Sequence, residues 1–150
     1  LEGYDVLLDQ YDEGARTADL QPVLENLRDS LVVLLERCKQ ASNPPKGQSL
    51  QQHFPIPQQR MLSRLVAEKV GYNFQRGRLD ETEHPFCTTL GPHDHRILTR
   101  YSEHHLSSGL FGTLHEAGHA MYEQGLPTHW FGLAPGMPAS LGINESQSRL

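Results

Sequence analysis

Apolar residues recur every three or four positions from Leu20 to Cys38, which is the pattern of an amphipathic helix. Asp19 can cap this helix, and Pro22 is tolerated in a first helical turn. We expect the apolar stripe to pack against a core, with the binding of a partner as the less favoured alternative. The acidic segment 1–17 that precedes it has some helical character.

Two further amphipathic helices follow a proline-rich loop over 43–57. The first covers 58–70 and ends at Gly71. Its inward positions are expected at Met61, Leu62, Leu65 and Val66. The second begins after Ser102 as its N-cap and stops at 125–127. Its buried stripe is expected at Leu106, Leu110, Leu114, Ala117 and Met121.

Alternating apolar and polar residues between these two helices predict strands. The run "YNFQRGRLD" (72–80) predicts a strand and a turn. The runs "HPFCTTL" (84–90) and "HRILTRY" (95–101) lie on either side of Gly91 and Pro92 and predict a small hairpin or sheet. After a loop, Ser140 can cap a last helix. The elements together predict a mainly α-helical fold with a small β-hairpin or sheet.

Composition narrows the classes of function. The chain has 150 residues, of which 37% are hydrophobic, and this suits a globular domain rather than a disordered segment. A net charge of -5 without a Lys/Arg cluster argues against nucleic acid as the main partner. No apolar run approaches the roughly 20 residues that span a bilayer, so no membrane partner is expected.

The cysteines and the two ends of the chain give two further expectations. Cys38 and Cys87 lie far apart and outside any CxxC pair, which predicts two free thiols in a reducing cytoplasm. The chain starts at Leu1 without a methionine and stops in a helix-like stretch. We therefore expect residues 1–150 to be one piece of a longer protein, truncated at both ends.

The stretch "GTLHEAGHAMYEQGLP" (112–127) carries the candidate chemistry. His115 and His119 are four residues apart, so on a helix their imidazoles lie on one face and can bind one ion. Glu116 is rotated by about 100° from His115 and is free to take a proton from a water that the ion activates. This is the HExxH arrangement of zinc peptidases.

A catalytic zinc needs a third protein ligand. Tyr122 and Gly125 occupy positions that are glycine and histidine in the longer pattern HExxHxxGxxH, so that class is excluded. Downstream of the motif only Glu123 and Glu145 are acidic. Glu123 is about 12 Å along the helix axis from the first histidine, too far for one ion. Glu145 is therefore the expected third ligand.

The motif alone is weak evidence, because a chain with this composition contains it by chance in roughly one case in twenty-five. The expected helix, its clean end and the later glutamate strengthen the zinc interpretation over that of a helix that merely contains histidine.

Several ordered motifs together carry a resemblance to a known family. "HPF" (84–86), "DHRILTRY" (94–101), "HEAGH" (115–119) and "SLGINESQSRL" (140–150) follow one another. This chain resembles the carboxypeptidase Taq family of zinc metallocarboxypeptidases, whose hallmarks are HPF, DxRxT, HExxH and HES/GQ in this order.

The resemblance implies exopeptidases that remove single residues from the free C-terminus of peptides. It implies a mainly helical fold with a small sheet beside a deep active-site groove. It also implies that the full-length protein is a homodimer and that residues 1–150 are the central portion of each subunit. One Zn²⁺ per chain, replaceable by Co²⁺, is implied at His115, His119 and Glu145, with Glu116 as catalytic acid/base. The family usually reads His-Glu-Ser-Gln where this chain has Asn144, which keeps Glu145 but puts a contact of that histidine in doubt.

Three other candidate residues keep two interpretations each. Arg96 either pairs with a substrate carboxylate or, as we favour, forms a structural ion pair with Asp94. His84 either lines the groove or holds a turn, and Tyr122 either stabilises an oxyanion or, more simply, packs in the core. Asn144, which can still donate and accept hydrogen bonds, and Gln147, which is close enough to orient Glu145, are expected beside the ligands but outside the ligand set. The remaining polar-stretch histidines are expected at the surface: His93, His95, His104 and His105.

Three functions remain open at this point. A metallocarboxypeptidase requires a free C-terminal carboxylate on its substrate. A zinc endopeptidase or oligopeptidase cuts amidated peptides equally well. A non-catalytic, metal-binding helical fragment cuts neither.

Overall fold

The computed structural model describes residues 3–44, 47 and 52–149. It consists of two compact units, Leu1–Gly47 and Gln48–Leu150. None of the described helices is both long and apolar enough to cross a membrane.

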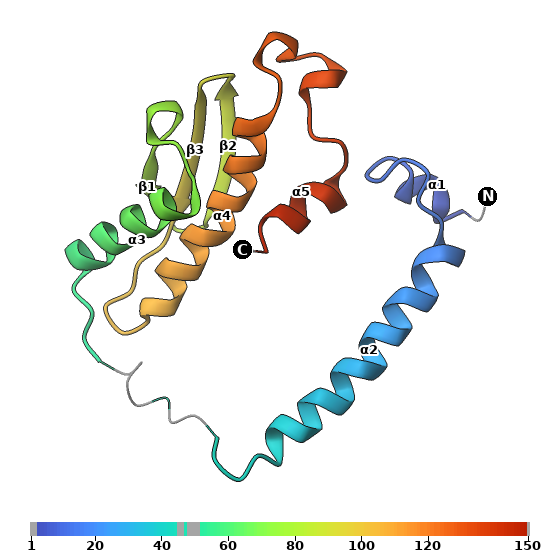
Figure 1. Cartoon of the computed structure of the whole chain (residues 1–150), viewed down its shortest axis with the longest axis horizontal. Coiled ribbons are helices and arrows are strands. Elements are labelled where there is room, and N and C mark those ends of the chain that lie inside the picture. The colour runs from blue at the N-terminus through green and yellow to red at the C-terminus, as the bar shows by residue number, and fades with distance from the viewer. Residues whose placement is uncertain (1–2, 45–46, 48–51, 150) are drawn as a thin grey trace. The chain divides into compact units, whose positions relative to one another are not determined.

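The first unit contains α1 (Asp5–Leu8) and α2 (Thr17–Lys39) (Figure 1). The predicted start of the long helix is wrong, because α2 begins at Thr17, leaving Asp19 in its first turn and Pro22 inside the helix. The Asp5 carboxylate accepts hydrogen bonds from the Thr17 backbone N at 2.8 Å and from its Oγ1 at 2.6 Å. The N-terminal end of α2 is therefore capped by Asp5, twelve positions before Thr17, and not by Asp19 as the local pattern predicted.

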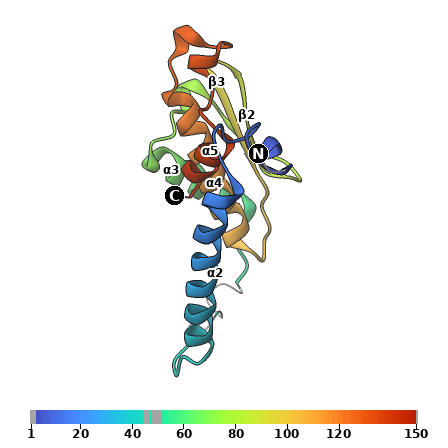
Figure 2. The same cartoon turned by 90° about the vertical axis from the view of Figure 1, so that its right-hand side faces the viewer.

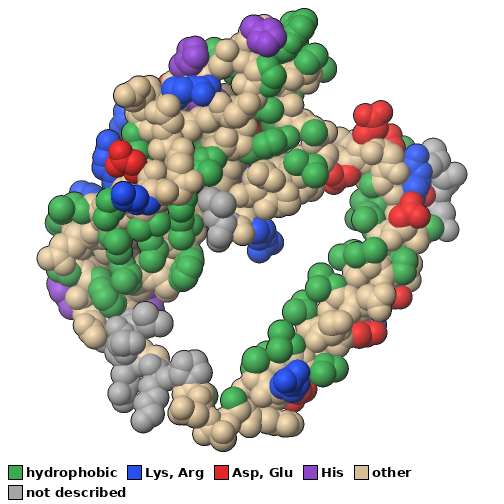
Figure 3. Space-filling view, in the orientation of Figure 1, with side chains coloured by type: hydrophobic (Ala, Val, Ile, Leu, Met, Phe, Trp, Pro, Cys, Tyr) green, Lys and Arg blue, Asp and Glu red, His purple; other side chains and the backbone are tan. Residues whose placement is uncertain are grey.

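The apolar stripe of α2 is not buried as expected. No residue of α2 is buried, and Leu24, Leu27 and Leu31 are 60%, 52% and 52% exposed. Hydrophobic side chains are visible along this helix in Figure 3. Within the described part of this unit, only the four-residue α1 accompanies α2, so the unit supplies too little surface to cover the stripe.

The second unit is built on three strands, β1 (Leu79–Glu81), β2 (Phe86–Gly91) and β3 (Asp94–Thr99), in the order β1-β3-β2. β2 and β3 form the predicted antiparallel hairpin, with Phe86 opposite Leu98, whereas β1 pairs with β3 in parallel. β2 is thus an edge of the described sheet.

The strand predicted at 72–80 is largely wrong. A 3₁₀ turn, η2, covers Phe74–Arg76, and the strand begins only at Leu79. Tyr72 is 2% exposed, its ring meets Phe74 edge-on with centroids 4.7 Å apart, and its hydroxyl donates to the His95 carbonyl. The alternation that suggested a strand therefore comes from two aromatic rings that pack on each other.

Helix α3 (Ile56–Val70) ends at Gly71, in the left-handed conformation, as predicted. It begins two residues earlier than expected, because Pro57 falls in the first turn, where a proline needs no N–H partner. The inward face also differs, since Met61 and Leu65 are 73% and 52% exposed. The buried positions are Gln59, Ser63 and Ala67.

A polar contact sets this orientation of α3. The Gln59 side chain donates to the carbonyls of Phe54 at 2.6 Å and of Ser102 at 2.8 Å. These bonds tie the start of α3 to the segment that precedes α4, and they hold α3 with its small side chains toward α4.

Helix α4 (Leu106–Gly125) packs against α3, β2 and β3. It begins after His105, not after Ser102, and His105 makes no side-chain cap. The predicted leucine stripe is only half buried. The buried residues are mostly small: Gly109, Thr113, Glu116, Ala117, Gly118, Ala120 and Gln124. Small side chains allow this helix to approach the sheet and α3 closely.

The core consists of Ala67, Tyr72, Ile97, Ala117 and Ala120. His95 belongs to the same inward face of β3 and is 2% exposed, so the expectation that it lies at the surface is wrong. Its Nδ1 lies 2.9 Å from Thr89 Oγ1, and burial lowers the pKa of its imidazole. Alternation along β3 places His95, Ile97 and Thr99 on one side.

After α4 the chain forms two 3₁₀ turns, η3 (Thr128–Trp130) and η4 (Ala134–Gly136), and then α5 (Leu141–Gln147). As predicted, Ser140 caps α5, its Oγ accepting a hydrogen bond from the Ile143 backbone N at 3.1 Å. α5 lies beside α4 in Figure 1 and Figure 2.

Candidate metal centre

Two histidines of α4 lie one turn apart on the same face of the helix. The ring centroids of His115 and His119 are 4.9 Å apart, and the ring planes are almost perpendicular, at 87°. The helix alone produces this arrangement, because residues four positions apart lie one above the other.

Helix α5 brings the third candidate ligand to the two histidines. The Glu145 carboxylate lies 3.8 Å from His119 Nε2. One ligand atom each of His115, His119 and Glu145 lies within 4.8 Å of the others. Ligand atoms around a tetrahedral zinc, with bonds of about 2.0–2.1 Å, lie about 3.3 Å apart, so modest side-chain rotations suffice to close the set.

Gly118 is the reason why α5 can approach α4 so closely. A Cβ atom at this position would lie 2.7 Å from Ser148 Cα and 2.9 Å from the carbonyl carbon of Gln147, and still closer to the Gln147 oxygen. These are backbone atoms, which cannot move aside as a flexible side chain can. The glycine within the HEAGH motif therefore permits the packing that places Glu145.

Glu116 is 7% exposed and lies beside the two histidines. Burial raises the pKa of its carboxyl, while the two histidines act in the opposite direction and Glu145 adds a further upward push. A carboxylate whose proton affinity is increased in this way is suited to accept a proton and release it again.

A pocket of about 350 Å³ surrounds these residues. Its walls come from β2 and the residue before it, from α4 and from α5: Pro85, Phe86, Cys87, Thr88, Thr89, His115, Glu116, His119, Glu123, Asn144 and Glu145. The Cys87 thiol in this wall is free, as expected of both cysteines. Burial, assisted by Glu116 and Glu123, raises its pKa to about 12, so it remains a neutral thiol at ordinary pH.

Two more residues of the pocket extend the arrangement behind His119. Asn144 Oδ1 is hydrogen-bonded to His119 Nδ1, and Asn144 Nδ2 lies 3.5 Å from Glu123 Oε1. Burial raises the pKa of Glu123, while His119 and the Asn144 amide lower it. The sequence pattern excluded Glu123 as a metal ligand and indicated no other role for it, whereas the structure places it next to Asn144.

The other predicted residues lie outside this pocket. Arg96 forms a two-pronged ion pair with Asp94, its Nε and Nη2 at 2.9 and 2.7 Å from the carboxylate, and this contact lowers the pKa of Asp94. His84 is exposed, although the two residues that follow it line the pocket. The structural ion pair favoured for Arg96 is thus present, and the substrate contacts of Arg96 and His84 stay predictions.

Gln147 and Tyr122 also face elsewhere. The Gln147 amide donates to Ser146 Oγ at 3.4 Å rather than to Glu145. The Tyr122 hydroxyl accepts a hydrogen bond from the Ala139 backbone N at 3.1 Å. Both residues line a different hollow, whose lining includes none of the three candidate ligands.

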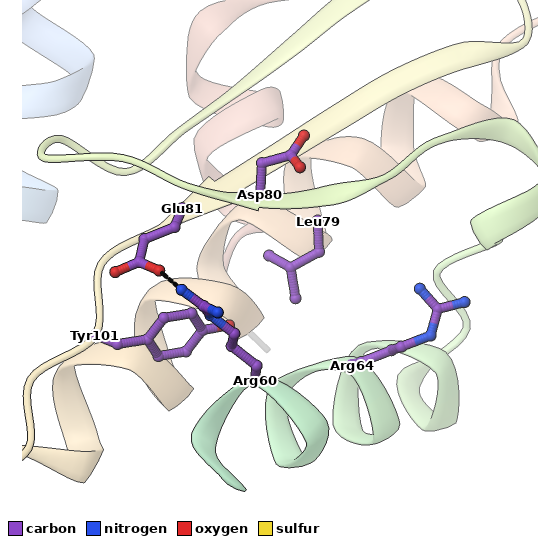
Figure 4. A pocket seen from close by; sticks show the side chains of 6 residues that line it. All are labelled: Arg60, Arg64, Leu79, Asp80, Glu81 and Tyr101. Carbon is purple, nitrogen blue, oxygen red and sulfur yellow. Dashed lines mark hydrogen bonds and ion pairs between the residues drawn. The ribbon is translucent and has the colours of Figure 1, made fainter. Parts of the chain in front are cut away.

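A second pocket of unit 2, of about 380 Å³, lies between α3 and β1 and is shown in Figure 4. Leu79 points toward α3, and Asp80 points to the opposite side of the strand. The charges of this pocket are already paired: Arg60 with Glu81, Arg78 with Asp80, and Arg64 over the Phe74 ring at 4.0 Å. It lacks the converging nitrogen and carboxylate ligands of the pocket around His115.

Sequence reasoning missed three contributions to the site. The signal for Gly118 was a glycine between the two histidines of a predicted helix, where a residue without a side chain lets another segment approach closely. Glu123 is four residues after His119, hence on the same face of α4. The wall of β2 carried no signal of its own, because Cys87, Thr88 and Thr89 become part of the site only through sheet packing.

Comparison of the sequence with known proteins shows which family this chain is similar to. A sequence model of the family described as carboxypeptidase Taq (M32) metallopeptidase matches residues 1–150. Thermostable carboxypeptidase 1 of Thermus thermophilus is 45% identical over 148 residues, which is 99% of this chain and 29% of the relative. Carboxypeptidase 1 of Bacillus subtilis is 39% identical over 145 residues, 97% of this chain and 29% of the relative.

Solved structures have the same fold. The M32 carboxypeptidase of Deinococcus radiodurans, 42% identical, superposes with a TM-score of 0.88 over 94% of this chain and 28% of that one. The carboxypeptidase of Pyrococcus furiosus, 36% identical, gives a TM-score of 0.86 over 97% of this chain and 30% of that one. The predicted mainly helical fold with a small sheet is confirmed, and the chain spans less than a third of the length of these relatives.

Proposed function

This chain belongs to the carboxypeptidase Taq (M32) metallopeptidase family, and we propose that it carries the zinc site of a metallocarboxypeptidase that removes single residues from the free C-terminus of peptides. In this proposal His115, His119 and Glu145 bind one Zn²⁺ per chain, which Co²⁺ can replace, and Glu116 is the general base.

The observation that carries the proposal is the meeting of three ligand atoms within 4.8 Å in a pocket that also contains Glu116. Two imidazole nitrogens and one carboxylate oxygen are a donor set that zinc accepts in catalytic sites, with a further position left for water or substrate. The residues present therefore fit the metal that the family implies.

When bound, Zn²⁺ supplies Lewis acidity, which polarises the scissile carbonyl and makes a water acidic enough to be deprotonated near pH 7. The Glu116 carboxylate takes the proton of the attacking water and later delivers it to the leaving amine. Its burial favours this role, because the raised pKa makes it a stronger base than an exposed glutamate. β2 and the residue before it form one wall of the pocket in which these groups lie.

For the whole protein we propose peptides as substrates, a homodimer as the assembly and the cytoplasm as its location, with residues 1–150 as the central portion of one catalytic domain. The peptide substrate is supported by the names of the relatives, and the dimer by the resemblance of the motifs. The cytoplasm is supported by two cysteines that are both free.

A matched pair of peptides tests the specificity. The intact protein, loaded with zinc, is incubated with one peptide that has a free C-terminus and with the same peptide amidated. We expect loss of single C-terminal residues from the free peptide and at least about a hundredfold slower cleavage of the amide, since a charged recognition contact is lost. Equal cleavage of both supports the endopeptidase or oligopeptidase alternative.

Zinc content of the same preparation separates the remaining alternative. About one zinc per chain together with cleavage supports the proposal. One zinc without cleavage of any peptide supports a non-catalytic, metal-binding chain, and absence of zinc from the folded protein refutes the site itself.

A further inference from the structure

The two ring nitrogens of His119 face different partners. Its Nε2 lies toward Glu145, at 3.8 Å, and therefore toward the proposed zinc. Its Nδ1 is hydrogen-bonded to Asn144 Oδ1. His119 is largely buried, with 12% of its side chain exposed, so little water competes for its ring nitrogens.

We propose that Asn144, held in turn by Glu123, is a positioning residue that fixes the tautomer and the ring orientation of His119 for metal binding. This inference rests on the zinc site proposed above, and it assigns a role to two residues that are not ligands.

The Glu123 carboxylate decides which way the Asn144 amide points. Asn144 Nδ2 faces Glu123 Oε1 at 3.5 Å, a long contact but one between a donor and an acceptor. The opposite orientation would place the amide oxygen against the carboxylate, and two acceptors would then face each other. The electrostatic preference therefore directs Asn144 Oδ1 to His119.

The amide oxygen in turn decides which nitrogen of His119 carries the proton. An amide oxygen only accepts, so Nδ1 must be the N–H that donates to it. The neutral imidazole then has its lone pair on Nε2, on the side of Glu145 and the proposed zinc. Ligating histidines commonly donate their second N–H to a neighbouring acceptor in this way, and loss of that acceptor weakens metal binding about 10- to 100-fold.

The same helix contact that places Glu145 also places Asn144. Both residues are on α5, which Ser140 caps and which lies against Gly118 of α4. Asn144 is only half buried and its backbone makes an ordinary helical bond to the Ser140 carbonyl at 3.1 Å, so its side chain is not required to form the helix.

Zinc affinity of the intact protein, measured by competition with a chelator, tests the role without any peptide. Asn144→Leu keeps the number and the branching of the side-chain heavy atoms, favours the helix more than asparagine does, and removes both polar atoms. We expect its zinc dissociation constant to rise about 10- to 100-fold. Gln58→Leu makes the same amide-to-leucine change at an exposed position of α3 and is expected to leave zinc affinity within about twofold, as a surface change should.

Two further variants ask whether the hydrogen bonds, rather than the volume, are responsible. The double variant Asn144→Asp/Glu123→Gln exchanges donor and acceptor, so that the new amide at position 123 donates to the new carboxylate at position 144, which still accepts from His119. Asn144→His offers one acceptor and one donor on a neutral ring, which matches the asparagine amide. Both are expected to bind zinc within about fivefold of the wild type, because each keeps an acceptor for His119.

The visible spectrum of the cobalt-loaded protein reports on ligand geometry independently of affinity. We expect it to change in Asn144→Leu and to be retained in the two rescuing variants. Thermal unfolding of the metal-free proteins shows whether each variant is folded.

The outcomes distinguish this inference from the function on which it rests. A wild type that binds no zinc refutes the proposed function. A wild type that binds zinc, with Asn144→Leu binding it equally well, refutes the positioning role alone. If Asn144→Leu and both rescuing variants lose affinity to the same extent, asparagine acts through its shape, and the hydrogen-bond mechanism is wrong.

Discussion

Replacing Gly118 by alanine adds one methyl group at the point where α4 meets the end of α5. The new Cβ would lie 2.7 Å from Ser148 Cα and 2.9 Å from the carbonyl carbon of Gln147. Carbon atoms in van der Waals contact are about 3.5–4.0 Å apart, so the end of α5 must move away by about 1 Å.

Two effects on stability oppose each other. Overpacking of this kind costs about 1–3 kcal/mol, whereas alanine is favoured over glycine in a helix by about 1 kcal/mol. We therefore expect the free energy of unfolding to fall by about 0–2 kcal/mol, small enough for the variant to fold.

The effect on zinc is expected to be larger, because Glu145 lies only two residues before the clash. A displacement of about 1 Å moves its carboxylate away from the proposed zinc position beside His115 and His119, and misplacements of this size cost up to about a hundredfold where geometry is critical. We expect zinc affinity, measured by chelator competition, to fall by at least about tenfold.

Gly125→Ala is the matched control on the same helix. A Cβ there meets no atom within 4 Å, so zinc affinity and stability should be unchanged or slightly improved. A folded Gly118→Ala variant that binds zinc as tightly as Gly125→Ala would show that α5 does not need this close contact, and the argument for Gly118 would fail.

Four further predictions concern single side chains. Glu116→Gln should retain zinc and lose at least about a hundredfold in peptide turnover, since an amide cannot accept the proton; full activity would exclude Glu116 as base. Loss of a residue that only supports a metal ligand typically weakens metal binding about 10- to 100-fold, and Glu145→Ala, which removes a proposed ligand, should weaken zinc binding by more than that. Unchanged zinc affinity would mean that another residue is the third ligand. Cys87, whose pKa is raised to about 12, should react with iodoacetamide at pH 8 far more slowly in the native protein than after denaturation, and equal rates would contradict its burial. The pKa of His95 is lowered in the folded state, so the neutral imidazole stabilises the fold above the unfolded-state pKa of about 6.5, and this stabilisation is lost as the pH falls below that pKa. Urea unfolding of His95→Asn should therefore show a smaller loss of stability from pH 7.5 to pH 5.5 than urea unfolding of the wild type.

The fold was predictable where local pattern and packing agree. The hairpin on either side of Gly91 and Pro92, the stop of α3 at Gly71 and the Ser140 cap of α5 depend on residues next to one another in the chain. Prediction failed where a distant partner decides: Asp5 holds the start of α2, and Gln59 turns α3 so that Met61 faces outward.

His95 illustrates a signal that was present but not used. A histidine amid polar residues resembles a surface residue, yet it is two positions before Ile97 on a strand, and the period of two places both side chains on one face. The hydrogen-bonding partner Thr89 then satisfies the buried ring.

By itself the sequence determined that His115 and His119 lie together and that Glu116 lies beside them, because an α-helix repeats every three to four residues whatever surrounds it. It also left Glu145 as the expected third ligand, since Glu123 is the only other acid after the motif. Only the tertiary structure decided that Asn144 links His119 to Glu123 and that Gly118 receives the end of α5. These contacts join residues 21 to 30 positions apart across two packed helices, and packing at that separation follows from the whole fold rather than from any local pattern.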